Sequence, residues 1–421
     1  MIPAAILFVL TYILILALPK YRHLVAVGAA ILFVVFGILP VGKVLYEIDY
    51  NIILMLIGTM GIVALFIASN MPQRIADLLL KKVSNVCWAI IALALLAGVI
   101  SAFVDNVATL LIVAPVGIAI SKRIGISPVP VLIAISVSSN LQGAATLVGD
   151  TTSILLGGYA KYDFIDFFFH AGKPGIFWSV ELGAVATIPV MYFLFKKFKQ
   201  PIKAGRPAEV SDTFPTFLLF ALVLLLIAAS FIQQKPAITN GLICVGLCLL
   251  GVLHDAFRGV GRASITRVAR GIDFVTIFLL AGLFVVVAGV REAGVIDFIG
   301  QMLLKVSGDS MFLAYTLIVF ASVFFSAFID NIPYVATMLP VVQIMANSMG
   351  VDPTLFYFGL LTGATLGGNF TPIGASANIT AIGMLRKEGH EVKLWDFMRI
   401  GIPFSLAAVA VGYVVIWFIW K

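Results

Sequence analysis

Charged residues are scarce in this chain of 421 residues, where Asp, Glu, Lys and Arg together make up 11%. Soluble domains carry about 25% charged residues, so the composition excludes an ordinary soluble enzyme, a disordered chain and a nucleic-acid-binding protein. The net charge of +7 is then typical of basic loops in a membrane protein. Hydrophobic residues make up 62% of the chain, and the lipid bilayer is therefore its expected partner.

Cysteine and histidine are scarce too, with 3 and 4 residues respectively. Cys87, Cys244 and Cys248 lie in apolar runs, and their spacing matches neither a disulfide framework nor a metal site. Cys244 and Cys248 are four apart on one helix face, where they could bind a thiophilic metalloid. Because they lie away from the interrupted segments, we expect packing roles for them instead. The first apolar run, residues 2–18, follows no basic segment and precedes no typical cleavage site. We therefore interpret it as a retained membrane span.

Apolar runs long enough to span a bilayer, which takes roughly 17–25 residues, follow one another along the chain. They cover about 2–18, 24–41, 51–69, 87–121, 129–160, 175–195, 214–232, 238–254, 273–290, 311–345, 353–384 and 401–420. Runs 87–121 and 311–345 are too long for one helix and carry Asp-Asn near the middle, which favours re-entrant helical hairpins. Runs 129–160 and 353–384 are interrupted by Gly, Ser, Thr and Asn, which favours discontinuous helices. The sequence thus predicts an all-α polytopic membrane protein with ten spans and two hairpins.

Basic residues set the expected orientation of these spans. With the N-terminus outside, most of the 27 lysines and arginines fall in predicted cytoplasmic segments, as the positive-inside rule requires. Lys20 and Arg22 belong to the first such segment. We therefore expect a multi-pass protein of the plasma (inner) membrane with both termini outside. Because 86–121, 129–160, 309–345 and 353–385 contain no Lys or Arg, a multiply charged anion would find no fixed countercharge in the interrupted segments.

The two halves of the chain share a repeated motif. The hexapeptide SAFVDN at 101–106 returns as SAFIDN at 326–331, and residues 101–158 align without a gap on 326–383. Each predicted half has five spans, one of them discontinuous, and one hairpin, so its number of crossings is odd and the second half must be inverted. Inverted repeats with interrupted helices are the architecture of secondary transporters. A duplicated scaffold without a transport role is the alternative, but broken helices in lipid are unfavourable unless they line a cavity.

Polar residues at the breaks form the candidate site. Glycines let the backbone leave the helix, and we assign this role to Gly143, Gly149, Gly368 and Gly374. The freed carbonyl groups can then hold a cation, and the freed N–H groups an anion. The expected substrate- or ion-binding residues are Asp105, Asn106, Ser139, Asn140, Thr146, Asp150, Thr151, Ser153, Asp330, Asn331, Asn369, Thr371, Ser376 and Asn378, and no catalytic residue is expected.

The aspartates of this set are its strongest candidates. A carboxylate deep in a membrane is a functional-site hypothesis by default, so we expect Asp105 and Asp330 to handle protons or cations. Asp150 has Ala375 as its repeat equivalent and either carries a second charge or faces a vestibule. Asn106 and Asn331 have a simpler alternative, because Asn is also a common residue at helix N-caps.

The motifs resemble the ion-transporter superfamily of ArsB-type arsenite permeases, NhaD-type Na⁺/H⁺ antiporters, citrate and dicarboxylate transporters, and the melanosomal P protein. GNFTPIGASAN at 368–378, DNIP at 330–333 and GAATLVGD at 143–150 are particularly similar to the ArsB and P-protein branch. That branch continues Asp-Pro-Pro-Asn, whereas Thr151, Thr152 and Ser153 follow Asp150 here. The Ser-Asn-Thr signature of the dicarboxylate branch is not matched, because Leu141 follows Ser139 and Asn140.

The resemblance implies a fixed scaffold and a transport part that moves across the membrane like an elevator. By position, 1–85 and 214–308 are the expected scaffold, 86–200 and 309–421 the expected transport part, and 201–213 a cytoplasmic linker. Dimers are common in the superfamily, so a homodimer is compatible with the resemblance.

We therefore expect H⁺- or Na⁺-coupled secondary transport of a small inorganic solute or ion, with bound Na⁺ or H⁺ as the sole cofactor. Arsenite or antimonite efflux leads, Na⁺/H⁺ antiport is the alternative, and anion or dicarboxylate transport comes third. A passive channel is a further class, to be separated by uphill flux. An intramembrane aspartyl protease would need Gly-x-Gly-Asp, which LVGD at 147–150 does not match, so no enzymatic activity is expected.

Overall fold

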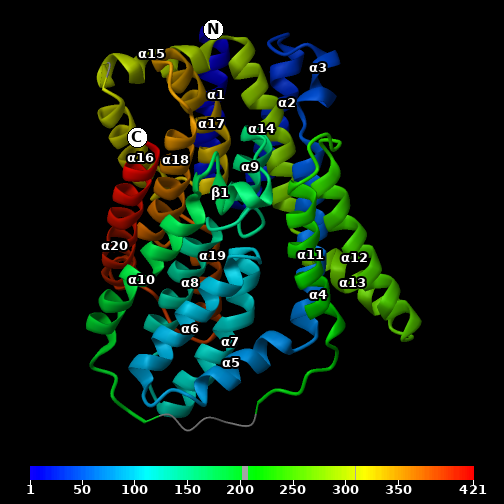
Figure 1. Cartoon of the computed structure of the whole chain (residues 1–421), viewed down its shortest axis with the longest axis vertical. Coiled ribbons are helices and arrows are strands. Elements are labelled where there is room, and N and C mark those ends of the chain that lie inside the picture. Colours follow the sequence, from blue (N-terminus) through cyan, green and yellow to red (C-terminus); the bar gives the residue numbers. More distant parts are fainter. Residues whose placement is uncertain (202–206, 309) are drawn as a thin grey trace.

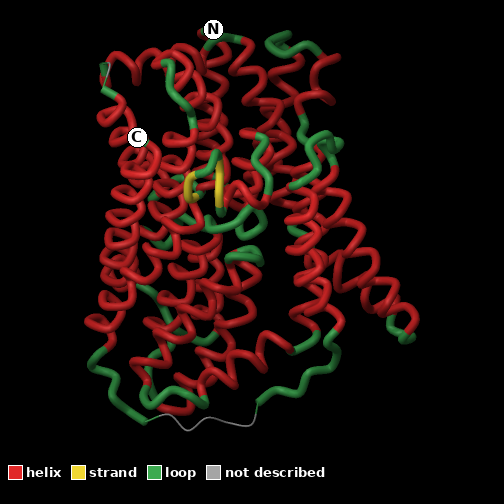
Figure 2. The backbone as a smooth tube through the Cα atoms, in the orientation of Figure 1, coloured by secondary structure: helices red, strands yellow, loops and turns green. Residues whose placement is uncertain are grey.

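The chain folds almost entirely into helices (Figures 1 and 2). A computed structural model describes residues 1–201, 207–308 and 310–421, and the predicted linker 201–213 and the predicted domain start at 309 therefore lie partly outside the described residues. Within the described ranges the only strands are β1 (Phe169–His170) and β2 (Lys173–Pro174), which pair antiparallel. The predicted all-helical class is thus nearly correct.

The helices follow one another with short connections. In the first half they are α1 (Ile2–Ala17), α2 (Arg22–Val35), α3 (Val41–Glu47), α4 (Tyr50–Ala68), α5 (Met71–Leu80), α6 (Val86–Ser101), α7 (Asn106–Ile124), α8 (Val129–Gly143), α9 (Thr151–Ala160) and α10 (Ile176–Phe195). In the second half they are α11 (Phe214–Ser230), α12 (Thr239–Phe257), α13 (Gly261–Gly271), α14 (Phe274–Glu292), α15 (Val295–Ser307), α16 (Met311–Ser326), α17 (Asn331–Met349), α18 (Thr354–Gly367), α19 (Ser376–Lys387) and α20 (Leu394–Trp420). Three 3-10 turns, η1 (Pro19–Tyr21), η2 (Phe164–Phe167) and η3 (Gly368–Phe370), complete the chain as described.

Several of these helices can cross a membrane. Seven helices of the described residues are long and apolar enough to do so, and nine spans result if each of two bent helix pairs counts as one. The predicted count of ten is higher because some apolar runs form short helices, such as the 14-residue α2 and the 17-residue α11. The chain is a multi-pass membrane protein, whereas ten spans and the re-entrant nature of the hairpins remain predictions.

The predicted breaks are present in both halves. Four residues after the end of α6, Asp105 caps the N-terminus of α7, and Asp330 caps α17 in the same way after α16. The interrupted segments break where their glycines predict, since α8 ends at Gly143 before α9 begins at Thr151, and η3 separates α18 from α19. In Figure 1 the hairpin α6–α7 lies toward the bottom of the view and the hairpin α16–α17 toward the top.

The two breaks make equivalent contacts in the two halves. The Thr146 hydroxyl donates a hydrogen bond to the carbonyl of Ala102, and the Thr371 hydroxyl, 225 residues later, donates to the carbonyl of Ala327. Each threonine therefore ties its broken helix to the end of the preceding hairpin helix. This shared bonding explains why a threonine stands at both positions.

Glycine is required three residues after each of these threonines for a steric reason. A Cβ atom at Gly149 would lie 2.6 Å from the carbonyl oxygen of Gly143, and one at Gly374 would lie 2.6 Å from that of Gly368. Real Cβ atoms essentially never approach this closely. The four glycines predicted at the breaks are thus two pairs of close backbone contacts.

Helices of the two halves pack against one another. α4 packs on α12 and α2 on α14, while α10 packs on α20. The α4–α12 contact depends on small residues, because a Cβ at Gly58 would lie 2.3 Å from the Cys244 backbone and one at Gly61 would lie 2.3 Å from the Cys248 sulfur. Cys244 and Cys248 are buried in this contact, as their predicted packing role requires.

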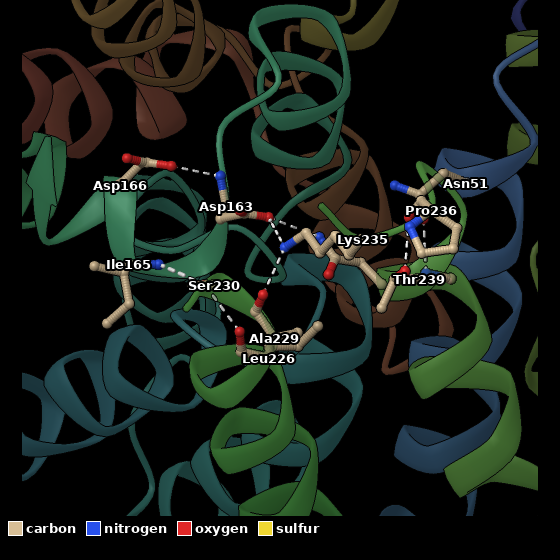
Figure 3. Close-up of polar contacts among 12 residues, drawn as sticks. Asn51, Asp163, Ile165, Asp166, Leu226, Ala229, Ser230, Lys235, Pro236 and Thr239 are labelled. Atoms are coloured by element: carbon tan, nitrogen blue, oxygen red, sulfur yellow. Dashed lines mark hydrogen bonds and ion pairs between the residues drawn. The ribbon is translucent and has the colours of Figure 1, made fainter. Parts of the chain in front are cut away.

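A polar cluster joins the loop after α9 to the turn between α11 and α12 (Figure 3). The ammonium group of Lys235 donates to an Asp163 carboxylate oxygen at 2.5 Å and to the carbonyl of Ala229 at 3.0 Å. Asn240 also donates to Asp163, at 3.4 Å. The ion pair links parts of the two halves that are far apart in the sequence.

Candidate functional site

A cavity of about 190 Å³ lies where the two hairpins meet. Residues of both breaks line it, together with α4 and the start of α14. The predicted site residues that line it are Asp105, Asn106, Asp150, Thr151, Asn331 and Ser376. The fold therefore brings residues from both repeats to one small cavity.

Asp105 is one of three acids at this cavity, with Asp150 and Asp273, that have no cationic partner among the described residues. Its carboxylate accepts hydrogen bonds from the backbone N–H groups of Val107, at 3.0 Å, and Ala108, at 3.3 Å. These are the free N–H groups at the start of α7, where the helix dipole also favours a negative charge. The carboxylate is thus held in place by the helix end, not by an ion pair.

Asp150 is the second acid and is only 3% exposed. Its carboxylate accepts hydrogen bonds from the Thr151 backbone N–H and the Thr152 hydroxyl, both at 2.8 Å, and from the Asn331 side chain at 3.4 Å. The last contact joins the broken helix of the first half to the hairpin of the second half. Asp150 therefore shares the cavity with Asp105.

Asp330 has a different environment from its repeat equivalent Asp105. The Arg22 guanidinium donates to the Asp330 carboxylate at 2.7 Å, and the Ser376 hydroxyl donates to the same oxygen at 2.9 Å. The two side chains of the ion pair are 14% and 10% exposed. Arg22, which the sequence places in a cytoplasmic segment, is therefore largely buried, at the corner where the chain bends by 113° between α1 and α2.

Asn106 and Asn331 are not helix caps, since the preceding aspartates take that role. The Asn106 amide instead donates to the Asn140 side chain at 2.9 Å. Asn140 donates in turn to the Thr365 carbonyl at 2.8 Å and to the Asn369 side chain at 3.0 Å. A buried chain of amides thus connects the first hairpin with the broken helix of the second half.

The remaining predicted residues hold the breaks together behind the cavity. Asn378 accepts a hydrogen bond from Ser136 at 2.6 Å and donates to the carbonyls of Gly368 and Thr371 at 3.0 and 3.2 Å. Its repeat equivalent Ser153 donates to the Gly143 carbonyl at 3.1 Å. The Ser139 hydroxyl donates to the carbonyl of Ser136, and the Asn369 amide donates to the carbonyl of Val137. Thr146 and Thr371 bond as described above, and none of these residues lines the cavity.

Four polar residues of the cavity wall are not among the predicted site residues, namely Thr59, Arg270, Asp273 and Thr276. Asp273 caps α14 by accepting from the Thr276 N–H at 3.2 Å and from its hydroxyl at 2.6 Å. An acid at the start of an apolar run was the available signal for Asp273. The expectation that the site has no fixed countercharge is wrong, because Arg270 lines the cavity and Arg22 pairs with Asp330. Both arginines lie outside the interrupted segments, where the sequence has no Lys or Arg.

The cavity is suited to cations that prefer oxygen ligands. Its polar wall presents carboxylate, amide and hydroxyl groups, with Arg270 as the one Lys or Arg side chain among the residues lining it. Hard cations such as Na⁺ prefer oxygen ligands, and a carboxylate can equally take up a proton. The three aspartates exceed the single arginine in charge, so cation or proton binding is electrostatically favoured.

Known proteins resemble the chain over most of its length. Residues 12–358 and 242–421 match the model of CitMHS, described as a citrate transporter family. An uncharacterized transporter of Mycobacterium tuberculosis (strain ATCC 25618 / H37Rv) is 30% identical over 98% of this chain and 97% of that protein. The P protein of Homo sapiens is 26% identical over 87% of this chain, which corresponds to 53% of that protein.

Two solved structures share the fold. The YdaH transporter of Alcanivorax borkumensis has a TM-score of 0.61 at 12% identity, covering 89% of this chain and 86% of that chain. MtrF of Neisseria gonorrhoeae, described within a class of antimetabolite efflux pumps, has a TM-score of 0.55 at 16% identity, with coverages of 87% and 80%. At these identities the likeness concerns the fold alone.

Proposed function

Because the chain belongs to the citrate transporter family CitMHS, we propose that it is an H⁺- or Na⁺-coupled secondary transporter of a small inorganic solute or ion. It is a secondary transporter of the same kind as the P protein. The family and the relatives are transporters, which fits a protein without enzymatic activity. One observation carries the proposed coupling, namely that Asp105 and Asp150 line one cavity without an ion-pair partner in the described residues.

Cation coupling follows from the charge of this cavity. Two carboxylates that share a small, poorly solvated space repel each other, and binding a proton or Na⁺ removes part of that repulsion. An empty carrier would have to move these charges uncompensated through the membrane, which is unfavourable. Loading with the coupling ion therefore favours movement of the transport part.

For the cargo, arsenite or antimonite efflux is the first proposal, supported by the motif resemblance. Na⁺/H⁺ antiport is the alternative and needs no ligand beyond the carboxylates. A carboxylate anion is the next candidate, because Arg270 lies in the cavity wall and the family is described as a citrate transporter family.

We infer further that the two halves are inverted and that access to the site alternates. Asp49 caps α4 as Asp273 caps α14, at an offset of 224 residues. A second cavity, of about 430 Å³, is lined by Asp49 and Phe284, and the residues at this offset from them, Asp273 and Met60, line the first cavity. Two cavities built from equivalent residues fit access routes from opposite sides. The second cavity meets α17 at Ala336 and Leu339, beyond the Asn331 position that the first cavity reaches.

The subdomains and the cellular setting complete the proposal. The pairing of α2 with α14 and of α4 with α12 supports a scaffold of residues 1–85 and 214–308. The pairing of α6 with α8, α16 with α18 and α10 with α20 supports a transport part of residues 86–200 and 309–421 that moves as an elevator. We propose the plasma (inner) membrane as the location, with both termini outside, and a homodimer as the assembly.

Reconstituted vesicles test this function. Purified protein is placed in liposomes with an imposed H⁺ or Na⁺ gradient, and uptake of labelled arsenite, antimonite, Na⁺ and citrate is followed. Uphill accumulation of one of them that collapses with the gradient would support the proposal. Flux that only follows the cargo's own gradient would indicate a channel, and accumulation without either cation gradient would contradict the coupling.

A further inference from the structure

The two repeat-equivalent acids Asp105 and Asp330 differ in one respect that the repeat does not explain. Both cap the helix after the hairpin turn, but only Asp330 pairs with an arginine. The arginine comes from α2, in the proposed scaffold, whereas Asp330 belongs to the proposed transport part. The ion pair therefore crosses the boundary at which movement would occur.

The local structure places Arg22 at this boundary firmly. It is the first residue of α2, directly after the η1 turn, and the chain bends by 113° there. The Tyr12 hydroxyl of α1 donates to the Pro333 carbonyl at 2.6 Å and also bonds Thr337. Both contacts fix the α1–α2 corner against the first turns of α17. The Arg22 guanidinium thus reaches Asp330 from a corner that is hydrogen-bonded to α17 through Tyr12.

The pair has an electrostatic consequence. Neither charge is well solvated, at 14% and 10% exposure, and separating them would leave each one buried without compensation. The α16–α17 hairpin can leave α2 only if another positive charge replaces the guanidinium at Asp330. The coupling cation is the group that can do so.

We infer that Arg22 is a tethered substitute for the coupling cation at Asp330, holding the hairpin until H⁺ or Na⁺ displaces it. The inference rests on the proposed cation coupling and assigns different tasks to the two acids. Asp105, with Asp150, exchanges cations in the conformation seen here, while Asp330 is occupied by the protein itself. The cation that loads Asp330 releases the contact between the scaffold and the transport part.

The other side chains bonded to Asp330 or to the start of α17 are neutral or acidic and do not supply a positive charge to the Asp330 carboxylate. Ser376 of α19 donates to the carboxylate, and Tyr12 of α1 contacts α17 one turn further on. Tyr334 of α17 bonds Ser322. Asp150 accepts a hydrogen bond from Asn331, the residue after Asp330, and lines the first cavity together with Asp105. Arg22 is therefore the one cation paired with Asp330 within the described part of the chain.

Cation binding to the purified full-length protein tests the inference without a known cargo. Thermal unfolding is followed while Na⁺ is titrated at fixed pH and while pH is varied without Na⁺, because a bound cation stabilises the folded state. Arg22→Gln should lower the half-saturating Na⁺ or H⁺ concentration at least about tenfold, since the cation no longer competes with a guanidinium. Lys20→Gln is the matched control, because Lys20 is exposed two residues earlier and should respond like the wild type.

Two further variants separate competition from a merely structural role. The gain in affinity should disappear in Arg22→Gln combined with Asp330→Asn, which lacks the acid. Arg22→Lys keeps the charge but loses the forked geometry of guanidinium, so it should shift the affinity in the same direction by less, and it keeps the test decisive if Arg22→Gln does not fold. An unchanged cation response in the Arg22 variants, or a gain that persists without Asp330, would overturn the inference. No cation response in the wild type would instead overturn the proposed coupling itself.

Discussion

Replacing Asp330 by asparagine should destabilise the protein, whereas the same change at Asp105 should not. Both aspartates cap a helix, and asparagine caps a helix about as well as aspartate. The two variants therefore match as helix caps, and they differ in the ion pair with Arg22 and in the hydrogen bond from Ser376. Asp330→Asn leaves the Arg22 guanidinium, 14% exposed, without its carboxylate.

The magnitude follows from the burial of the pair. Removing one partner of a buried ion pair costs about 3–5 kcal/mol. Asp330 accepts the cap bond from Ile332 on one oxygen and the bonds from Arg22 and Ser376 on the other. The single oxygen of asparagine can replace only one of the two, so we expect about 3–5 kcal/mol for Asp330→Asn. For Asp105→Asn, which breaks no ion pair in the described residues, we expect less than about 1 kcal/mol. Its effect should fall on cation-coupled transport instead.

Unfolding of the purified variants in detergent, by heat or denaturant, measures the difference. Arg22→Gln added to Asp330→Asn should restore much of the lost stability, because the buried guanidinium is removed as well. The reasoning would be refuted if Asp105→Asn lost as much stability as Asp330→Asn. It would also fail if the double variant were no more stable than Asp330→Asn alone.

Two further outcomes are expected. Gly149→Ala and Gly374→Ala should each lower the unfolding temperature strongly, since their Cβ atoms would lie 2.6 Å from carbonyl oxygens. The control Gly246→Ala, whose Cβ would have no atom within 4 Å, should be neutral or slightly stabilising. Equal effects at all three positions would contradict the packing argument. Met60→Cys and Phe284→Cys place one thiol in each cavity, and the two should react with a membrane-impermeant thiol reagent from opposite sides of the membrane. The native cysteines are buried, so their background labelling should be low. Labelling of both variants from the same side would contradict inverted halves.

The breaks in the helices could be predicted from the sequence because their cause is local. Glycine and threonine recur at the same spacing in both halves, and the fold uses them in the same contacts. Asp105 and Asp330 follow the same logic, since an acid before a helix start is a cap signal. These features need only the neighbouring turns of the chain.

The position of Arg22 could not be predicted, because it depends on a partner 308 residues away. A basic residue between two apolar runs also matches an exposed loop, and the ion pair with Asp330 shows that Arg22 is largely buried instead. The roles of the polar residues were ambiguous for a related reason. In a broken helix, a side chain such as Asn378 can face a ligand or bond the freed carbonyls, and here it bonds the carbonyls.

Gradient-driven uptake by Asp150→Asn vesicles tests the central claim most directly. The asparagine oxygen can still accept from the Thr151 N–H, and its NH2 group can donate to the Thr152 hydroxyl, but the side chain carries no charge. Vesicles with wild-type protein or with Asp297→Asn, an exposed acid away from the cavity, should accumulate the cargo uphill on an imposed H⁺ or Na⁺ gradient. Asp150→Asn vesicles, with equal amounts of folded protein, should not, and uphill accumulation at the wild-type level would contradict the account.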